Sequence, residues 1–245
     1  MGNVRIAGSV NTPFWLTISR DVADKFPECK VIGVDFSNPP SGAQPENLEF
    51  IVEDATSEWV YDDNFDFVHI RGLFGSIADW PALYSQIYQH LHPGGWLEQM
   101  EWSVHTKSDD GTLDPSTELG SWGPRAAALA DLNGKTAEIA ERMAGLIREA
   151  GFVDIVEKRY KWPIGSWSSD PVSKKIGHWN IKNWDEGMEG WTMALYTRKA
   201  GVRVHHYLSQ GSANEFKYSS KQVKDLLQRV RKDLRRRRQH VYHEV

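Results

Sequence analysis

Two acidic residues stand after apolar runs, where they are placed to bind the polar groups of a nucleoside. Asp35 ends the run Val31-Ile32-Gly33-Val34, and Asp54 follows the run at 48–52. An acid at the end of a buried strand is the arrangement that hydrogen-bonds ribose hydroxyls, so Asp35 is a candidate for that contact. Asp54 is a candidate acceptor for an adenine amino group. The alternative is structural, with each carboxylate capping the turn that follows its strand.

A histidine and an arginine form a second candidate site, at the end of the apolar run 65–70. Free histidine titrates at about pH 6.5, so His69 is able to act as a general base near neutrality. His69 and Arg71 are therefore the candidate catalytic residues. A structural role is the alternative, and it is the commoner one for a single histidine at a strand end.

A sheet whose strands all end at one edge would bring these residues together, and residues 4–102 predict one. The predicted strands are 4–7, 30–35, 48–52, 65–70 and 96–100, separated by helix-like segments at 12–26 and 77–91. The connection His92-Pro93-Gly94-Gly95 ends the second helix. This alternation predicts an α/β fold, namely a Rossmann-like, doubly wound, mostly parallel sheet with flanking helices, and such sheets bind ligands beyond the carboxyl ends of their strands.

Residues 103–245 have a different, mainly helical pattern. The polar segment 105–123 predicts a loop or lid, and helices are predicted at 124–150, 173–197 and 219–238. Gly151 is a C-cap candidate and Ser219 or Ser220 an N-cap candidate, while 152–162 alternates like a strand. Because there is no internal repeat and no evident linker, we expect a single domain, 1–245.

Composition and charge argue against several classes of protein. The chain of 245 residues has a formal net charge of -4 and a pI near 6.1, which gives no reason to expect a nucleic-acid or anionic-membrane partner for the whole chain. It has no apolar run of membrane-spanning length and no secretory signal, so we expect an intracellular protein, cytoplasmic or nuclear. The 11 tryptophans suit either a core or a ligand cleft.

Histidines and arginines near the C-terminus raise two further possibilities. His205-His206, His240 and His243 match no known ligand spacing, and the single cysteine, Cys29, excludes a cysteine-rich zinc site, so no metal is expected. The arginine run 235–238 is compatible with nucleic-acid binding or nuclear import. Solvated cations at a helix C-terminus are the favoured interpretation.

In combination, these features resemble the class I S-adenosylmethionine (SAM)-dependent methyltransferases, and within them the fungal LaeA-like (TAM-domain) group. The resemblance covers about residues 15–242. It rests on the segments Val31-Ile32-Gly33-Val34-Asp35-Phe36-Ser37, His69-Ile70-Arg71, Gly75-Ser76-Ile77-Ala78-Asp79-Trp80 and Pro93-Gly94-Gly95-Trp96-Leu97-Glu98-Gln99-Met100-Glu101, together with 21–27, Asp54-Ala55, 177–180, 186–190 and 230–234.

The resemblance implies SAM as the cofactor and a role for each candidate residue. Asp35 would bind the ribose with Phe36 beside it, Asp54 and Ala55 would flank the adenine, and His69 would lie near the methionine end or the acceptor, as would Arg71. The cofactor-binding residues implied in this way are Gly8, Asp35, Phe36, Asp54, Ala55 and His69. Residues 1–102 would form the cofactor-binding half, and 103–245 would supply substrate or lid helices and the C-terminal part.

The segment after the first predicted strand departs from the family pattern. The family has Asp-x-Gly-x-Gly-x-Gly there, because a side chain would collide with the cofactor, whereas this chain has Ile6-Ala7-Gly8-Ser9-Val10-Asn11-Thr12-Pro13, in which only Gly8 could serve. Residues 201–217 resemble an insertion, and within the printed sequence we expect no counterpart of the family's N-terminal helices or last strand. There are two explanations for these departures. Either the gene model has altered exon ends, or the protein has abandoned methyl transfer.

The resemblance implies methyl transfer to a small-molecule acceptor in fungal secondary metabolism. Most of the catalysis would come from holding donor and acceptor in line, so a general base is optional. The alternative is a catalytically impaired or repurposed relative that binds a protein partner and regulates. The altered glycine loop favours that alternative, whereas Asp35, Asp54 and Pro93-Gly94-Gly95 favour the enzyme.

Overall fold

The chain divides into two compact units in the computed structural model, which describes residues 2–8, 14–36, 44–61, 64–196, 218–236 and 239–245. The sheet unit comprises residues 1–101 and 141–157, and the helical unit comprises 102–140 and 158–245. The expected boundary after residue 102 lies one residue from the first division, but 141–157 belong with the sheet. The assignment of 1–245 to a single domain stays a prediction.

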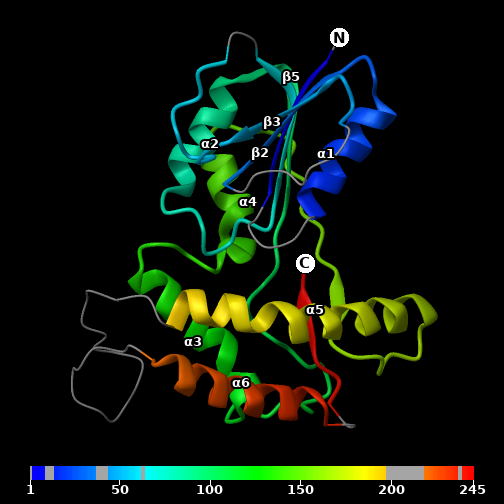
Figure 1. The fold of residues 1–245 in the computed structure, drawn as a ribbon, viewed down its shortest axis with the longest axis vertical. Coiled ribbons are helices and arrows are strands. Elements are labelled where there is room, and N and C mark those ends of the chain that lie inside the picture. The colour runs from blue at the N-terminus through cyan, green and yellow to red at the C-terminus, as the bar shows by residue number, and fades with distance from the viewer. Residues whose placement is uncertain (1, 9–13, 37–43, 62–63, 197–217, 237–238) are drawn as a thin grey trace. The chain divides into compact units, whose positions relative to one another are not determined.

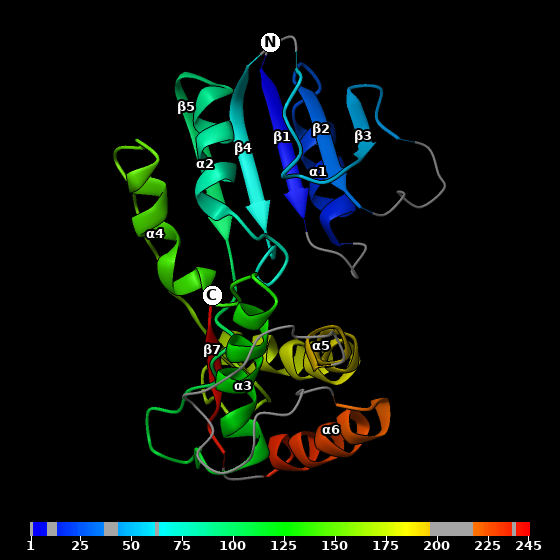
Figure 2. The same ribbon diagram turned by 90° about the vertical axis from the view of Figure 1, so that its left-hand side faces the viewer.

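Five parallel strands form the sheet unit, in the order β3-β2-β1-β4-β5 (Figure 2). They are β1 (Asn3–Gly8), β2 (Lys30–Asp35), β3 (Leu48–Val52), β4 (Phe65–Arg71) and β5 (Leu91–Met100). The predicted parallel sheet is confirmed, and β2 and β3 have the predicted bounds. The nearly continuous apolar run of β2, in which residues 31–35 are all buried, is typical of a parallel strand that is covered on both faces.

Helices cover both faces of this sheet (Figure 1). α1 (Phe14–Lys25) packs on one face, against a core that includes Val4, Ile6 and Val31. α2 (Trp80–Gln89) lies on the other face, with α4 (Ile139–Glu149) beside it. α2 begins at its N-cap Asp79, whose side chain accepts a hydrogen bond from the backbone N–H of Ala82 at 2.9 Å.

The predicted helix end at Leu91 and the predicted connection at 92–95 are wrong. α2 ends at Gln89, and β5 already begins at Leu91. Leu91 pairs with Phe65 and Trp96 with Phe67, so residues 92–95 form an irregularity within the strand. Gly94 has a φ of 86°, a left-handed conformation that a glycine adopts without strain.

The helical unit packs α3 (Glu118–Leu132), α5 (Pro171–Tyr196) and α6 (Ser220–Leu234) around one apolar core. A short antiparallel pair, β6 (Lys161–Pro163) and β7 (Tyr242–Glu244), completes it. The N-cap of α6 is Ser219, which forms a capping box with Gln222, and this confirms one of the two predicted N-caps. The predicted helix at 173–197 is confirmed as α5.

Three predictions for residues 105–162 are wrong in part. The polar segment is a loop only up to Thr117, because α3 begins at Glu118 and continues through Pro124. The single helix at 124–150 is two helices, separated after Asn133 by Gly134 with a φ of 70°. The strand at 152–162 is reduced to Lys161–Pro163. Within the described ranges, no helix has the length and apolar character needed to cross a bilayer.

Candidate functional site

The carboxyl ends of the five parallel strands lie along one edge of the sheet unit, which is the carboxyl edge (Figure 2). The strand register places Gly8 opposite Arg71, and Asp35 opposite Val52. The predicted residues on β1, β2 and β4 are therefore brought to one edge, as the sequence pattern indicated. The rest of the predicted glycine loop, 9–13, lies outside the described residues.

Asp35 and Phe36 combine a buried carboxyl with an exposed aromatic ring at the end of β2. Asp35 is 4% exposed and Phe36 is 58% exposed. The backbone carbonyl of Asp35 accepts a hydrogen bond from the N–H of Glu53 at 3.0 Å, which ties the end of β2 to the residues after β3. A buried carboxylate with a fixed backbone suits the binding of paired hydroxyl groups.

Asp54 and Ala55 form a turn after β3. Oδ1 of Asp54 accepts hydrogen bonds from the backbone N–H of Thr56 at 2.9 Å and from its hydroxyl at 2.7 Å. The carbonyl of Ala55 accepts from Nε1 of Trp59 at 3.1 Å. This geometry is the turn-capping role that the structural alternative predicted for Asp54, and contact with adenine stays a prediction for both residues.

A buried arginine supports this turn from the sheet. The Arg5 side chain is 1% exposed, and its Nη2 lies 3.3 Å from Oε1 of Glu53. Its guanidinium carbon lies 3.5 Å from the centre of the Trp59 ring, and the hydroxyl of Tyr61 donates to the same Glu53 oxygen at 3.0 Å. Burial lowers the pKa of Arg5 to about 10 and raises that of Tyr61 to about 12. Arg5 was not among the predicted residues, because a charged residue inside an apolar strand gives no sequence signal for its partners.

His69 makes a short polar contact with a residue on the neighbouring strand. Its Nδ1 lies 2.8 Å from Oε2 of Glu98, its register partner on β5. The Nε2 atom is buried and has no hydrogen-bond partner among the described residues. Burial lowers the pKa of His69 below 6.5, although the hydrogen bond and the charge of Glu98 act in the opposite direction. Burial likewise lowers the pKa of Arg71.

Glu101, directly after β5, holds the loop that follows β4. Its two carboxylate oxygens accept hydrogen bonds from the backbone N–H groups of Leu73 at 3.0 Å and Phe74 at 3.1 Å. The amide of Gln99 donates to the first of these oxygens at 3.3 Å. Burial raises the pKa of the Glu101 carboxyl to about 7, against the lowering effect of these hydrogen bonds. Glu101 was not among the predicted site residues, although it ends one of the segments that carry the resemblance.

Comparison with known proteins identifies the family. A methyltransferase-domain family model matches residues 15–156. The secondary metabolism regulator LAE1 of Cochliobolus heterostrophus is 33% identical over 228 residues, which are 92% of this chain and 69% of that protein. The chain belongs to the methyltransferase family. The methyltransferase pytC of Aspergillus terreus is 38% identical over 171 residues, and the aligned part is 70% of this chain and 53% of pytC.

The fold of this methyltransferase-family chain agrees with a solved structure. The phosphoethanolamine N-methyltransferase 2 of Haemonchus contortus, solved in complex with S-adenosyl-L-methionine, gives a TM-score of 0.50 at 17% identity, over 99% of this chain and 47% of that one. The predicted LaeA-like class I methyltransferase fold is confirmed. The chain spans about half the length of pytC, the first of the curated relatives that it matches.

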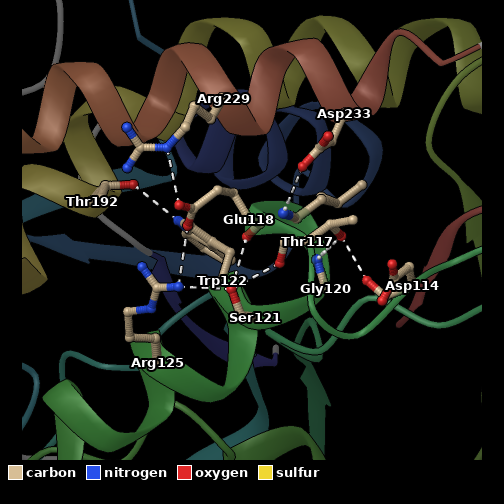
Figure 3. A network of polar contacts seen from close by, with 11 residues as sticks. Asp114, Thr117, Glu118, Gly120, Ser121, Trp122, Arg125, Thr192, Arg229 and Asp233 are labelled. Carbon is tan, nitrogen blue, oxygen red and sulfur yellow. Dashed lines mark hydrogen bonds and ion pairs between the residues drawn. The ribbon is translucent and has the colours of Figure 1, made fainter. Parts of the chain in front are cut away.

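Arginines at and near the end of α6 form ion pairs with neighbouring helices. Arg229 contacts Glu118 on α3 at 3.0 Å, where Figure 3 shows it joining the network at the start of that helix. Arg231 and Arg235 both contact Asp185 on α5. These pairs support the structural interpretation of the arginine run, of which residues 237–238 lie outside the described residues.

The histidines that were considered for a metal site make different contacts. His240 contacts Asp110 at 2.5 Å, whereas His243 is buried against the rings of Trp162 and Trp184. His205-His206 lies outside the described residues. In the part of the chain that the structure describes, no group of three or more His, Cys, Asp or Glu residues could hold a metal ion.

Proposed function

We propose that the protein binds SAM at the carboxyl edge of the sheet unit and transfers the methyl group to a small-molecule acceptor in fungal secondary metabolism. The buried Asp35 at the end of β2, beside the exposed Phe36, carries this proposal. Membership of the methyltransferase family and the names of the relatives, pytC and LAE1, support it.

The residues at this edge fit SAM by their chemistry. A ribose offers two hydroxyl donors, and the Asp35 carboxylate is an acceptor for both. Phe36 offers an apolar face, and the Nε2 atom of His69 is a buried group with no partner among the described residues. When bound, SAM supplies an electrophilic methyl group, and the protein's own residues would bind and orient the reactants.

Calorimetric titration with S-adenosylhomocysteine tests this proposal. The purified chain should bind with a micromolar Kd, and Asp35→Ala should weaken binding by roughly 1.5–3 kcal/mol, as expected for hydrogen bonds to a charged group. Asp24→Ala, which removes an exposed acid from α1, is the matched control and should leave the Kd unchanged. An unchanged Kd in Asp35→Ala, with the fold intact by circular dichroism, would contradict the role of Asp35.

A second candidate function is a regulator that binds a protein partner rather than a methyl acceptor. The name of the relative LAE1, a secondary metabolism regulator, favours it. Failure of the folded chain to bind S-adenosylhomocysteine would favour this function over the first. For either function we propose a location in the cytoplasm or the nucleus.

A further inference from the structure

The contact between His69 and Glu98 decides which nitrogen of the histidine carries the proton. A neutral imidazole has one donor and one acceptor nitrogen, and a carboxylate only accepts. Because Oε2 of Glu98 lies 2.8 Å from Nδ1, the proton of neutral His69 belongs on Nδ1. The lone pair is then on Nε2.

Nε2 of His69 is a buried acceptor on β4, the strand that ends at the carboxyl edge where the proposed function places the reactants. It has no hydrogen-bond partner among the described residues, and leaving a buried acceptor unpaired is unfavourable. His69 and Arg71 are two residues apart on β4, so their side chains lie on the same face of the sheet. Arg71 pairs with Gly8 at the carboxyl edge. A ligand group that donates a hydrogen bond would recover this cost.

We infer that Glu98 is a positioning residue, which holds the proton of His69 on Nδ1 and so presents Nε2 as the proton acceptor for the hydroxyl group that receives the methyl. This inference rests on the proposed function. The exposed Glu98 carboxylate, with 64% of its side chain accessible, acts only through His69.

The chemistry favours a hydroxyl over an amine as the acceptor. A neutral amine has a nucleophilic lone pair and is methylated without a base, whereas methylation of a neutral hydroxyl would leave a strongly acidic oxonium ion. In the step that we infer, the acceptor oxygen forms a bond to the methyl carbon while the bond from that carbon to the sulfonium sulfur breaks. The O–H proton passes to Nε2. The products are a methyl ether, a neutral thioether and an imidazolium that Glu98 neutralises.

Burial and charge around His69 are consistent with a proton acceptor. Burial keeps the imidazole neutral near pH 7 by lowering its pKa. The charged groups that act on it are Glu98 on β5, which raises this pKa, and Arg71 on β4, which lowers it. The Phe67 ring is stacked 6.3 Å away between ring centres.

Nitrogen NMR of the full chain with labelled histidine tests the tautomer without any cofactor. His69→Gln identifies the signals, because it removes one histidine. The wild type should show the proton on Nδ1 of His69. Glu98→Gln keeps an acceptor and should keep this tautomer, whereas Glu98→Leu should move the proton to Nε2, which unconstrained imidazole prefers. Glu49→Leu, which removes another exposed acid of the sheet, should match the wild type.

Two results would overturn the assignment. One is a proton on Nε2 in the wild type, and the other is an unchanged tautomer in Glu98→Leu. Because Glu98 is exposed, these variants should fold, and circular dichroism checks this.

Methyl transfer from SAM to phenols of graded acidity tests the role of Nε2. His69→Gln should lower kcat by roughly a hundredfold with little change in KM, and Glu98→Leu should lower it less. The loss should be largest for the least acidic phenol, because an acidic phenol needs no base. An equal kcat in His69→Gln would overturn the role as proton acceptor. A protein with the expected tautomer that fails to bind S-adenosylhomocysteine would overturn the proposed function but not the positioning by Glu98.

Discussion

Glu101 is a buried carboxyl whose ionisation opposes folding, because its pKa of about 7 in the folded protein lies above the ordinary value of 4.5. Between these two values the folded state binds a proton that the unfolded state has released. The free energy of unfolding contributed by this group therefore falls as the pH rises from 4.5 to 7. The two backbone hydrogen bonds to Leu73 and Phe74 offset part of this cost.

Glu101→Gln should make this pH dependence disappear. Relative to the wild type, the variant should gain roughly 2–3 kcal/mol of unfolding free energy between pH 5 and pH 8, from the linkage relation. Urea denaturation of both proteins at the two pH values measures this difference. The variant is also expected to start from lower stability at pH 5, because an amide accepts only one of the two N–H groups. If the difference in unfolding free energy between the two proteins is the same at pH 5 and pH 8, the raised pKa of Glu101 is contradicted.

His243 should make the protein sensitive to acid. Burial lowers its pKa from 6.5 to about 4, so the folded state keeps the imidazole neutral. The stability contributed by this neutral form is present above pH 6.5 and is lost as the pH falls toward 4. When the pH falls from 7.5 to 5, the free energy of unfolding of His243→Leu should therefore decrease by roughly 2 kcal/mol less than that of the wild type. Equal losses, measured by urea denaturation, would refute this cause of acid sensitivity.

The strand-end residues were predictable one at a time, but their contacts were not. Asp35, His69 and Arg71 follow apolar runs that sequence patterns detect. The pairing of His69 with Glu98 depends on the register between β4 and β5, and the irregularity at 92–95 shifts that register. Because a shift of one residue turns every side chain to the other face, no pattern in the sequence fixes this contact.

At the scale of elements, two helical glycines should respond in opposite directions to alanine. In Gly177→Ala on α5, the new Cβ would lie 2.1 Å from the carbonyl oxygen of Gly165, and such overpacking costs roughly 1–3 kcal/mol. In Gly145→Ala on α4, no described atom outside the adjoining residues and the backbone of the same helix lies within 4 Å of the new Cβ, and the gain in helix propensity is about 0.5–1 kcal/mol. Thermal denaturation should show a lower Tm for the first variant and a higher Tm for the second. The same sign for both would contradict the packing.

The accuracy of the element predictions follows from where the stabilising contacts lie. β2 had the predicted bounds because burial on both faces of a sheet imposes an apolar run. β3 also had the predicted bounds, although it is an edge strand in which only Leu48 is buried. The segment 152–162 alternates as a strand would, yet only Lys161–Pro163 pairs with β7. A strand needs a partner as well as a pattern, and Asp154, with a φ of 55°, interrupts the run.

For the whole molecule, the similarity to known methyltransferases covers parts of both units. The family model matches residues 15–156, which include most of the sheet unit. The similarity to LAE1 extends over 92% of the chain and thus also includes the helical unit. The candidate site lies in the sheet unit alone. Binding of SAM at this site should therefore change the properties of the sheet unit.

Hydrogen–deuterium exchange with and without S-adenosylhomocysteine therefore tests the central claim most directly. We expect slower exchange in peptides that contain Asp35 and Phe36, Asp54 and Ala55, and the end of β4, with no change in peptides from α6. Protection at these strand ends would place the methyl donor at the carboxyl edge. Unchanged exchange at a saturating concentration of the compound, or protection confined to the helical unit, would contradict this placement.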